Sequence, residues 1–510
     1  MKIKKVAFIS AKLPYWNFVS SALFPEYGMP LIATIVRDGG YEVKQYVEHI
    51  GPINWDQVLD SDVVCFHTFS STMPKTIEYI HKIKKARPEM PIVIGGTHAS
   101  VMVEDTLQYC DVIVRQEGDE TLLEVLAHWN NGGDLSGVAG IAYWDRGRMR
   151  QNPDRPYVQK FDTIPDLKLI EGYFDWGLVK RLLHWRVRLQ VLQTSRGCPY
   201  DCSFCIAPRE LGRGYRIRSI DSVIADIKYQ IKMVGCRRFF VVDNHFTVNR
   251  GRAKELLNRI IKERINWSAT CFTRLEVAQD DELLALLKKA KVNTLYLGLE
   301  SFDNHVLKLL NKKQTGEKVR KALRKIRAHG IRPLGSFVMG SDEDTVESIR
   351  GTIDAAIEED LEYMVLFPLS GYPERNARTI PLQRFLLPTW DRLDGHFVIF
   401  LPKNMKPSTL QREINRGYRK FYGLGQILRR FRQSDFKSGL TRIAYSYWCW
   451  QIRRGTEEWA KYLESMEGPF YDDNERLIEG KLGEGIHPAK YPGSSLERHH
   501  ELVGSRLAPA

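Results

Sequence analysis

The sequence predicts an α/β protein made of two successive regions of alternating strands and helices, followed by a helical extension. Short β-rich runs alternate with helical patterns over residues 1–145, which indicates an N-terminal, doubly wound parallel sheet. The alternation recurs six times over residues 189–395 and indicates a partial (β/α)6 barrel. Residues 146–188, interrupted by Arg and Pro, are expected to be a linker. Residues 396–510 are expected to form a helical C-terminal extension that ends in a mobile tail.

The N-terminal elements follow from the spacing of apolar residues. Ligands of a doubly wound sheet bind beyond the carboxyl ends of its strands, so the residues that follow each strand are candidates for a binding site. The expected strands are residues 6–9, 43–47, 63–66, 92–94 and 111–114, and the expected helices are residues 31–37, 77–85 and 120–129.

The barrel elements follow from the same reasoning. Chemistry in such barrels gathers at the carboxyl ends of the strands, and a cysteine-rich loop directly follows the first expected strand. The expected strands are residues 189–194, 238–244, 268–273, 294–300, 334–339 and 363–369, and the expected helices are residues 220–233, 255–265, 282–289, 319–329 and 346–357.

Composition narrows the class of protein. The chain has 510 residues, enough for two or three domains, and it is 43% hydrophobic and 27% charged. It has no apolar run of about 18 residues, and its first residues lead directly into a strand, so we expect neither a membrane-spanning helix nor a secretory signal, and we expect a cytoplasmic protein. The net charge of +13 indicates a basic surface, but no nucleic-acid-binding motif accompanies it.

Three cysteines, Cys198, Cys202 and Cys205, form the pattern C-x3-C-x2-C. Three thiolates can hold three irons of a [4Fe–4S] cluster and leave the fourth iron open to another ligand. Disulfides do not suit an intracellular chain with eight scattered cysteines, and structural zinc sites usually need two separated pairs of ligands. The pattern therefore predicts a cluster with an open iron as the metal site.

The segment Arg-Gly-Cys-Pro-Tyr-x-Cys-x-Phe-Cys over residues 196–205 resembles the signature of radical S-adenosylmethionine (SAM) enzymes. The resemblance implies that SAM chelates the open iron. It implies that an electron from the cluster then splits SAM into methionine and a 5′-deoxyadenosyl radical, which abstracts hydrogen from an unactivated carbon.

The same resemblance implies a set of SAM-binding residues at the strand ends, while the residues alone leave Asp243 and Glu300 open as helix caps. Arg274 could instead pair with Glu300. The segment 336–343 resembles the family's G-x-I-x-G-x-x-E strand, with Ser336 in place of the first glycine. The implied SAM-binding residues are Phe204, Asp243, Asn244, Arg274, Glu300, Ser301, Ser336 and Gly340.

The N-terminal region resembles the cobalamin-binding domain that precedes many radical SAM barrels. The usual D-x-H-x-x-G motif is missing, and the segment at His49 has the wrong spacing. His67 ends the third expected strand and either faces the cofactor or makes a polar contact in the core. The alternative for the whole domain is a flavodoxin-like module that binds no ligand. The implied cobalamin-binding residues are Ser70, Ser71, Gly95, Gly96, Thr97, His98, Glu117 and Gly118.

These resemblances imply a cobalamin-dependent radical SAM enzyme, most simply a C-methyltransferase in which methylcobalamin donates its methyl group to a substrate radical. The alternatives are a radical oxidation, ring formation or carbon–carbon coupling without methyl transfer, and a non-catalytic iron–sulfur sensor or scaffold. We expect a small-molecule or lipid-like substrate, an electron donor such as flavodoxin or ferredoxin, and no nucleic acid. Apolar and aromatic residues recur at helical spacing over residues 440–450 among several arginines, which indicates a helix that either caps the barrel or lies peripherally on a membrane.

Overall fold

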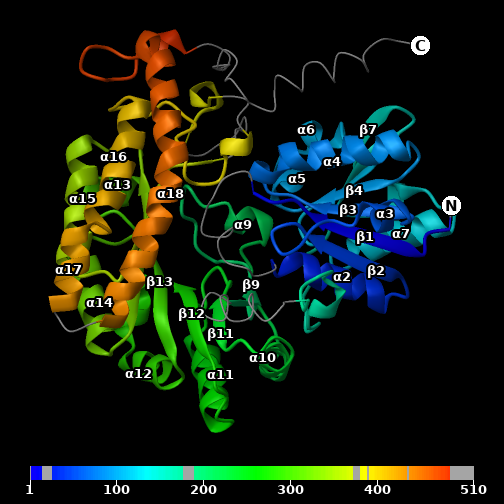
Figure 1. Ribbon diagram of the computed structural model, residues 1–510, viewed down its shortest axis with the longest axis horizontal. Coiled ribbons are helices and arrows are strands. Elements are labelled where there is room, and N and C mark those ends of the chain that lie inside the picture. Colours follow the sequence, from blue (N-terminus) through cyan, green and yellow to red (C-terminus); the bar gives the residue numbers. More distant parts are fainter. Residues whose placement is uncertain are drawn as a thin grey trace. The chain divides into compact units, whose positions relative to one another are not determined.

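The computed structural model describes residues 2–13, 26–175, 189–371, 380–386, 390–432 and 436–482 (Figure 1). The expected mobile tail and residues 176–188 of the expected linker lie outside this part. The chain forms two compact units, and strand β13 (Val292–Glu300) passes from the first to the second. The first unit comprises Met1–Asp201, Cys205–Leu297 and Lys325–Pro333, and the second comprises Cys202–Phe204, Gly298–Arg324 and Leu334–Ala510.

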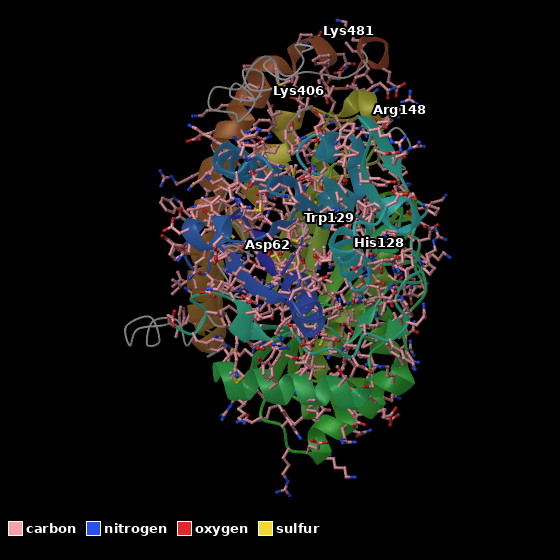
Figure 2. All side chains as sticks on the ribbon, turned by 90° about the vertical axis from the view of Figure 1, so that its right-hand side faces the viewer. Asp62, His128, Trp129, Arg148, Lys406 and Lys481 are labelled. Atoms are coloured by element: carbon pink, nitrogen blue, oxygen red, sulfur yellow. The ribbon has the colours of Figure 1, made fainter. Side chains whose placement is uncertain are left out.

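The first unit begins with a seven-stranded sheet in the order β2-β1-β3-β4-β5-β6-β7. Its first five strands run parallel, as predicted. The carboxylate of Asp62, labelled in Figure 2, accepts the backbone N–H groups of Lys4 and Lys5 and so joins the starts of β1 and β3. The strands are β1 (Lys5–Ser10), β2 (Glu42–Val47), β3 (Val63–His67), β4 (Ile92–Gly95), β5 (Val112–Val114), β6 (Ile141–Asp145) and β7 (Arg148–Gln151).

The last two strands of this sheet form an antiparallel hairpin. The sequence analysis expects connector where β7 lies, so this strand is a correction. Arg146 and Gly147, between β6 and β7, have φ values of 50° and 77°. Two successive residues with positive φ give the turn that best matches the twist of a two-residue hairpin. Arg148, labelled in Figure 2, is exposed on the edge strand that this turn creates.

Side chains alternate between the two faces of this sheet. Val6 and Phe8 belong to one core cluster, and Ala7 and Ile9 belong to another. Helices α2 (Gly28–Asp38) and α7 (Thr121–Asn130) supply the first cluster, whereas α3 (Trp55–Leu59), α4 (Met73–Ala86), α5 (Thr97–Val101) and α6 (Val103–Leu107) supply the second. Figure 1 shows α2 and α4 on opposite sides of the strands. This three-layer arrangement is the doubly wound fold that the sequence predicts.

The six predicted β/α repeats are present. In the first unit β8, β11, β12 and β13 run parallel in that order, and in the second unit β14 and β15 run parallel. The strands are β8 (Gln190–Leu192), β11 (Arg238–Val241), β12 (Ser268–Thr273), β13, β14 (Arg332–Met339) and β15 (Tyr363–Pro368). The helices between them are α10 (Ile220–Val234), α11 (Arg250–Lys262), α12 (Asp281–Lys289), α13 (Asn304–Leu309), α14 (Gly316–Ala328) and α15 (Val346–Glu358).

Local sequence signals set the ends of these helices. The Ser219 side chain accepts the N–H of Ser222 at the start of α10, and Gly235 ends that helix with a φ of 70°. Asp280 caps α12 in the same way. These are the preferred residue types at helix starts and ends, because they satisfy backbone groups that the helix leaves unpaired.

The C-terminal extension contains three helices in the second unit: α16 (Pro407–Phe421), α17 (Leu424–Arg432) and α18 (Phe436–Met466). Helices α16 and α17 are separated at Tyr422 and Gly423, where the chain does not continue as one helix. The hydroxyl of Tyr422 donates to the carbonyl of Met364 and accepts its N–H, both at 2.9 Å. A tyrosine on α16 therefore satisfies backbone groups of β15. Figure 1 shows α18 running along α16.

Within the described residues, no helix combines the length and the apolar character that crossing a membrane requires.

Candidate active site

The cysteine-rich loop is closed at its base by a short antiparallel pair, β9 (Ser195–Arg196) and β10 (Arg216–Ile217). The N–H of Cys198 donates to the carbonyl of Gly212 at 3.1 Å. Gly197 has a φ of 83°, and a Cβ at this position would clash with the carbonyl oxygen of Gly214. The Arg-Gly-Cys sequence is therefore needed where two backbone segments approach closely.

The motif cysteines differ from the others in accessibility. All eight cysteines are thiols, which excludes the disulfide alternative. Cys198 and Cys202 are half-buried and Cys205 is exposed, whereas the other five are buried. Burial raises the pKa values of Cys65, Cys110, Cys271 and Cys449, which keeps those thiols protonated. The three motif thiols are thus the ones available to bind iron.

In the described part of the chain, no three His, Cys, Asp or Glu side chains gather closely enough to hold a metal ion. The chemistry of the three donors, rather than a preformed metal geometry, identifies the cysteine loop as the ligand set. Three accessible thiols suit an iron–sulfur cluster that keeps one iron open.

Asp243 supports the strand that leads into the loop. Its carboxylate, which is fully buried, accepts the N–H of Thr194 at 2.6 Å and the hydroxyls of Thr194 and Ser195 at 2.5 and 2.7 Å. Burial raises the pKa of Asp243, and these hydrogen bonds act against that rise. The observed role of Asp243 is therefore to hold Thr194 and Ser195 in place before the cysteine loop. Its predicted contact with SAM stays a prediction.

A buried network of four charges joins the loop base to the first sheet. Arg196 donates to both carboxylate oxygens of Asp119, at 3.1 and 3.0 Å, and lies 3.2 Å from Glu117. Arg216 pairs with the other oxygen of Glu117 at 2.8 Å. We call Glu117, Asp119, Arg196 and Arg216 the anchor network. It fixes both strands that flank the cysteine loop to the segment that follows β5.

Glu117 belongs to this network, and its contact with cobalamin stays a prediction. The sequence analysis makes it a cobalamin contact, but its carboxylate also accepts the N–H of Val158 at 2.8 Å and only 7% of the residue is exposed. The hydrogen bonds from Val158 and Arg216 both go to Oε2, whereas Oε1 is buried and accepts no hydrogen bond within the described residues. The neighbouring Gly118 makes ordinary contacts with Ile32 and Val114.

An aromatic stack holds the middle of the loop. The guanidinium of Arg274 lies 4.0 Å from the Tyr200 ring centroid, and Tyr200 stacks on His245 with ring centroids 5.5 Å apart. Arg274 also pairs with Glu276 at 3.1 Å. The sequence analysis expects Arg274 to bind SAM or Glu300 and misses Tyr200 and His245. The tyrosine between two motif cysteines is the signal that could have found the stack.

In the second unit, Lys312 joins two of the predicted SAM residues. Its ammonium lies 2.9 Å from a Glu300 carboxylate oxygen and 6.0 Å from the Phe204 ring centroid. Lys312 and Glu300 are each only 4% exposed. Glu300 also has a φ of 65°, which is rare for a residue other than glycine and typical of functional sites. The sequence analysis misses Lys312, because it lies in an ordinary run of polar residues.

Gly298 makes room for this ion pair. A Cβ at Gly298 would lie 2.6 Å from the Glu300 carboxylate and 3.1 Å from the Lys312 ammonium. We expect Gly298→Ala to displace the pair and to lower the midpoint of thermal unfolding. Thermal unfolding followed by circular dichroism measures the effect. Gly351→Ala is the matched control, because nothing lies within 4 Å of its Cβ position in helix α15; equal midpoints for the two variants would contradict the role of Gly298.

The remaining predicted SAM-binding residues of the second unit are closely packed or hydrogen-bonded within the protein. Gly340 has a φ of 93°, and a Cβ there would clash with Leu410 of α16. Its N–H donates to Asp344 at 3.0 Å, and burial raises the pKa of Asp344 to about 6. The hydroxyls of Ser301 and Thr352 are 3.1 Å apart, and Ser336 is buried.

Two of the buried polar atoms that accept or donate no hydrogen bond within the described residues lie just after β11 and in the cysteine loop. They are the side-chain amide nitrogen of Asn244 and the hydroxyl of Ser203, and neither has a hydrogen bond within the described residues. A buried polar group without a partner is costly, so such groups often await a ligand. Asn244 therefore keeps its predicted place among the SAM contacts.

The cobalamin candidates lie at the carboxyl ends of β3, β4 and β5. Ser70 and Ser71 are buried, and the Ser70 hydroxyl lies 2.9 Å from Nδ1 of His98. Burial lowers the pKa of His98 to about 4, so its imidazole is neutral. A Cβ at Gly95 would make only ordinary contacts, whereas one at Gly96 would lie 2.6 Å from the Thr68 carbonyl. This edge is therefore small and polar, which suits a bulky ligand with polar groups.

A second polar group at the same edge involves helix α9 (Ala207–Glu210), which follows the cysteines. The Glu210 side chain hydrogen-bonds to Thr97. Burial raises the pKa of Glu210, and its carboxylate oxygen Oε1 is buried without a geometrically formed hydrogen bond in the described residues. Thr97 thus joins the predicted cobalamin edge to the cysteine loop.

His67 makes an ion pair with Glu26, with Nδ1 and the carboxylate 2.6 Å apart. Burial is the largest effect on His67 and acts to lower its pKa, but the charge and hydrogen bond of Glu26, together with the charge of Glu210, raise the pKa overall. Burial is also the largest effect on Glu26 and acts to raise its pKa, but the charge and hydrogen bond of His67, with smaller effects of His49 and Ser10, lower the pKa overall. Of the two interpretations of His67, the structure shows a polar contact.

We expect His67 to titrate above its ordinary pKa of about 6.5. The pair then stabilises the protein fully below that ordinary value and loses its effect as the pH rises through the raised pKa. In Glu26→Gln burial and the smaller effect of the Glu210 charge remain, so the pKa should fall below the ordinary value. NMR of 13C-labelled histidine, assigned with His67→Gln, measures both titrations. An unchanged pKa in Glu26→Gln would contradict the pairing.

The structure also contains a cavity of about 710 Å³ in the first unit, lined by the start of α10 and by one side of α11 along its length. Arg218, Arg252, Arg259 and Lys262 give it a basic lining. None of the predicted cofactor residues lines this cavity, so we do not assign it to the active site.

Comparison with known proteins identifies the two regions. Residues 192–356 match the Radical SAM superfamily, and residues 19–126 match the B12 binding domain. The chain belongs to the cobalamin-binding radical SAM enzymes. This family carries a [4Fe–4S] cluster, SAM and cobalamin. The thiols of Cys198, Cys202 and Cys205 suit the cluster, the unpartnered amide of Asn244 suits SAM, and the small polar edge around Gly95 suits cobalamin.

Similar proteins support this assignment. An "Uncharacterized methyltransferase PH0819" of Pyrococcus horikoshii is 26% identical over 79% of this chain and 89% of its own length. An anaerobic magnesium-protoporphyrin IX monomethyl ester cyclase of Rubrivivax gelatinosus is 26% identical over 65% of this chain and 62% of its own length. The structure of the radical SAM methyltransferase TsrM from Kitasatospora setae, with cobalamin and a [4Fe–4S] cluster bound, matches with a TM-score of 0.60 at 20% identity, over 72% of each chain. The likeness to TsrM shows the fold.

Proposed function

We propose that this cobalamin-binding radical SAM enzyme is a C-methyltransferase that adds a methyl group to an unactivated carbon. The presence of a B12 binding domain and a radical SAM domain in one chain carries the proposal. The relative named a methyltransferase, whose match spans most of both chains, supports it.

When bound, the cluster with SAM supplies a carbon radical and cobalamin supplies a carrier for a methyl group. This chain's residues must hold those groups in place and keep water away, because a primary carbon radical reacts with almost any neighbouring C–H bond. The anchor network and Asp243 serve this purpose in the first unit, since they fix the strands beside the cysteine loop. In the second unit the pair of Lys312 with Glu300 holds charge next to Phe204.

The substrate and the electron donor belong to the proposal as well. We propose a small or lipid-like substrate, because the C-terminal helix α18 exposes aromatic and aliphatic side chains. We propose a flavodoxin-type or ferredoxin-type donor. The exposed Cys205 places one cluster ligand within reach of such a partner.

A second candidate is a radical oxidation or ring closure without methyl transfer. The Rubrivivax relative, which is named a cyclase, favours this reading. Product mass separates the two reactions: methylation adds one carbon and two hydrogens to the substrate, whereas oxidation and ring closure add no carbon.

The experiment reconstitutes the full chain anaerobically with iron, sulfide and cobalamin, then adds SAM carrying a 13C-labelled methyl group, a reductant and pools of candidate lipids. We expect 5′-deoxyadenosine together with a lipid that gains one labelled carbon. Production of 5′-deoxyadenosine with an oxidised, unlabelled product would overturn methyl transfer in favour of the second candidate. No 5′-deoxyadenosine would favour a non-catalytic sensor or scaffold.

A further inference from the structure

Helices α17 and α18 expose large apolar side chains. Leu440, Ile443, Tyr447 and Trp450 of α18 are 64%, 47%, 59% and 45% exposed. Their spacing of three, four and three residues places them along one stripe of the helix. The opposite side of α18 is buried, as Trp448 and Ile452 show. The helix is therefore apolar on the side that packs against the protein and on the side that faces outward.

Helix α17 adds to the exposed apolar surface. Leu424 and Leu428, one turn apart, are 78% and 54% exposed. A Cβ at Gly439 of α18 would lie 2.8 Å from the Phe431 ring of α17, so the two helices approach closely near that turn. We call the six side chains Leu424, Leu428, Leu440, Ile443, Tyr447 and Trp450 the apolar face. A cluster of this kind usually marks an interaction site.

The charge around the apolar face is strongly biased. Residues 424–455 contain seven arginines and lysines and a single acidic residue, Asp435. Arg429 and Arg430 pair with Asp360, Arg430 also lies 3.9 Å from Glu362, and Arg442 is buried against backbone carbonyls. Arg432 and Arg454 are exposed, and the Arg454 guanidinium lies 5.3 Å from the Trp450 ring centroid. The exposed charge beside the face is therefore positive as far as Arg454, and the exposed Glu457 and Glu458 follow one turn later on α18.

We propose that the apolar face seats this enzyme on the surface of an anionic lipid bilayer. Tyr447 and Trp450 stack at 5.9 Å and have the amphipathic rings that settle at the boundary between headgroups and acyl chains. The leucines and Ile443 enter the acyl layer, while Arg432 and Arg454 meet lipid phosphates. The proposal does not depend on methyl transfer, because it concerns only the outer side of α17 and α18.

The test mixes reconstituted full-length protein with vesicles of phosphatidylcholine alone, or of phosphatidylcholine with phosphatidylglycerol, and measures sedimentation. We expect binding to the anionic vesicles that weakens as salt is added. Leu440→Gln/Ile443→Gln/Trp450→Gln should bind roughly tenfold more weakly or worse. Arg432→Gln/Arg454→Gln should lose mainly the preference for anionic lipid. Leu309→Gln is the matched control, since Leu309 of α13 is 45% exposed outside the face and its loss should not change binding.

Circular dichroism and vesicle-independent 5′-deoxyadenosine formation show that each variant still folds. Three outcomes would overturn the proposal. The first is no sedimentation of the wild type with anionic vesicles, and the second is an equal loss of binding in Leu309→Gln. The third is a wild-type dimer in solution that the triple variant makes monomeric, because a second copy of the chain would then cover the face.

Discussion

Replacing Cys198, Cys202 or Cys205 by alanine should remove the cluster and stop radical formation. Each substitution removes one of three donors from a cluster that already leaves an iron without a protein ligand. We expect 5′-deoxyadenosine formation to fall at least about 100-fold. Loss of a residue that only hydrogen-bonds to a metal ligand usually lowers activity by less than this. Iron content and the visible absorption of the anaerobically reconstituted variants measure the cluster directly.

The control for these variants is Cys236→Ala. Cys236 is buried, and its thiol donates to the carbonyl of Arg238 rather than belonging to the motif. This variant should keep its iron and its activity. Equal iron loss in Cys236→Ala and Cys202→Ala would show that the effect comes from folding and not from ligation.

Arg196→Gln should destabilise the base of the cysteine loop by about 3–5 kcal/mol, because it leaves buried carboxylates without their partner. The Arg196 side chain is 5% exposed and pairs with Asp119 and Glu117. Hydrogen exchange of residues 195–217 is the suitable measurement, since a chain of several domains does not unfold in two states. Faster exchange should come with lower cluster occupancy after reconstitution.

Arg213→Gln is the matched control for this variant. Arg213 lies in the same loop and pairs with Asp201 at 2.8 Å, but both side chains are largely exposed, so the pair contributes at most about 1 kcal/mol. The double variant Arg196→Gln/Asp119→Asn should recover part of the loss, because it removes both charges of one pair. Equal protection in Arg196→Gln and Arg213→Gln would contradict the anchor network.

The order of the elements and the cysteine motif could be predicted from the sequence, since both depend on local patterns. Alternation of strands and helices and a fixed cysteine spacing are visible along the chain. The β6–β7 hairpin was not predicted. Its turn has positive φ values at both Arg146 and Gly147, and the sequence there is not one of the residue pairs that strongly favour such a turn.

The partners of the candidate site residues could not be predicted, because some come from distant parts of the chain and others depend on local space that the sequence does not show. Glu117 follows β5 of the first sheet, whereas its partners Arg196 and Arg216 lie much later in the sequence, in the strands that flank the cysteine loop. Lys312 meets Glu300 only because Gly298 leaves space for their ion pair. Motifs therefore indicate which residues belong to a site, whereas ion pairs and hydrogen bonds decide which of them can contact a ligand.

The measurement that tests the account most directly follows the methyl group of SAM. The full chain is reconstituted anaerobically with its cluster and cobalamin, and SAM with a deuterated methyl group is added with a reductant. We predict that 5′-deoxyadenosine forms and that cobalamin recovered from the protein carries the deuterated methyl group, even before the substrate is known. Formation of neither, with iron and cobalamin both bound, would contradict the account.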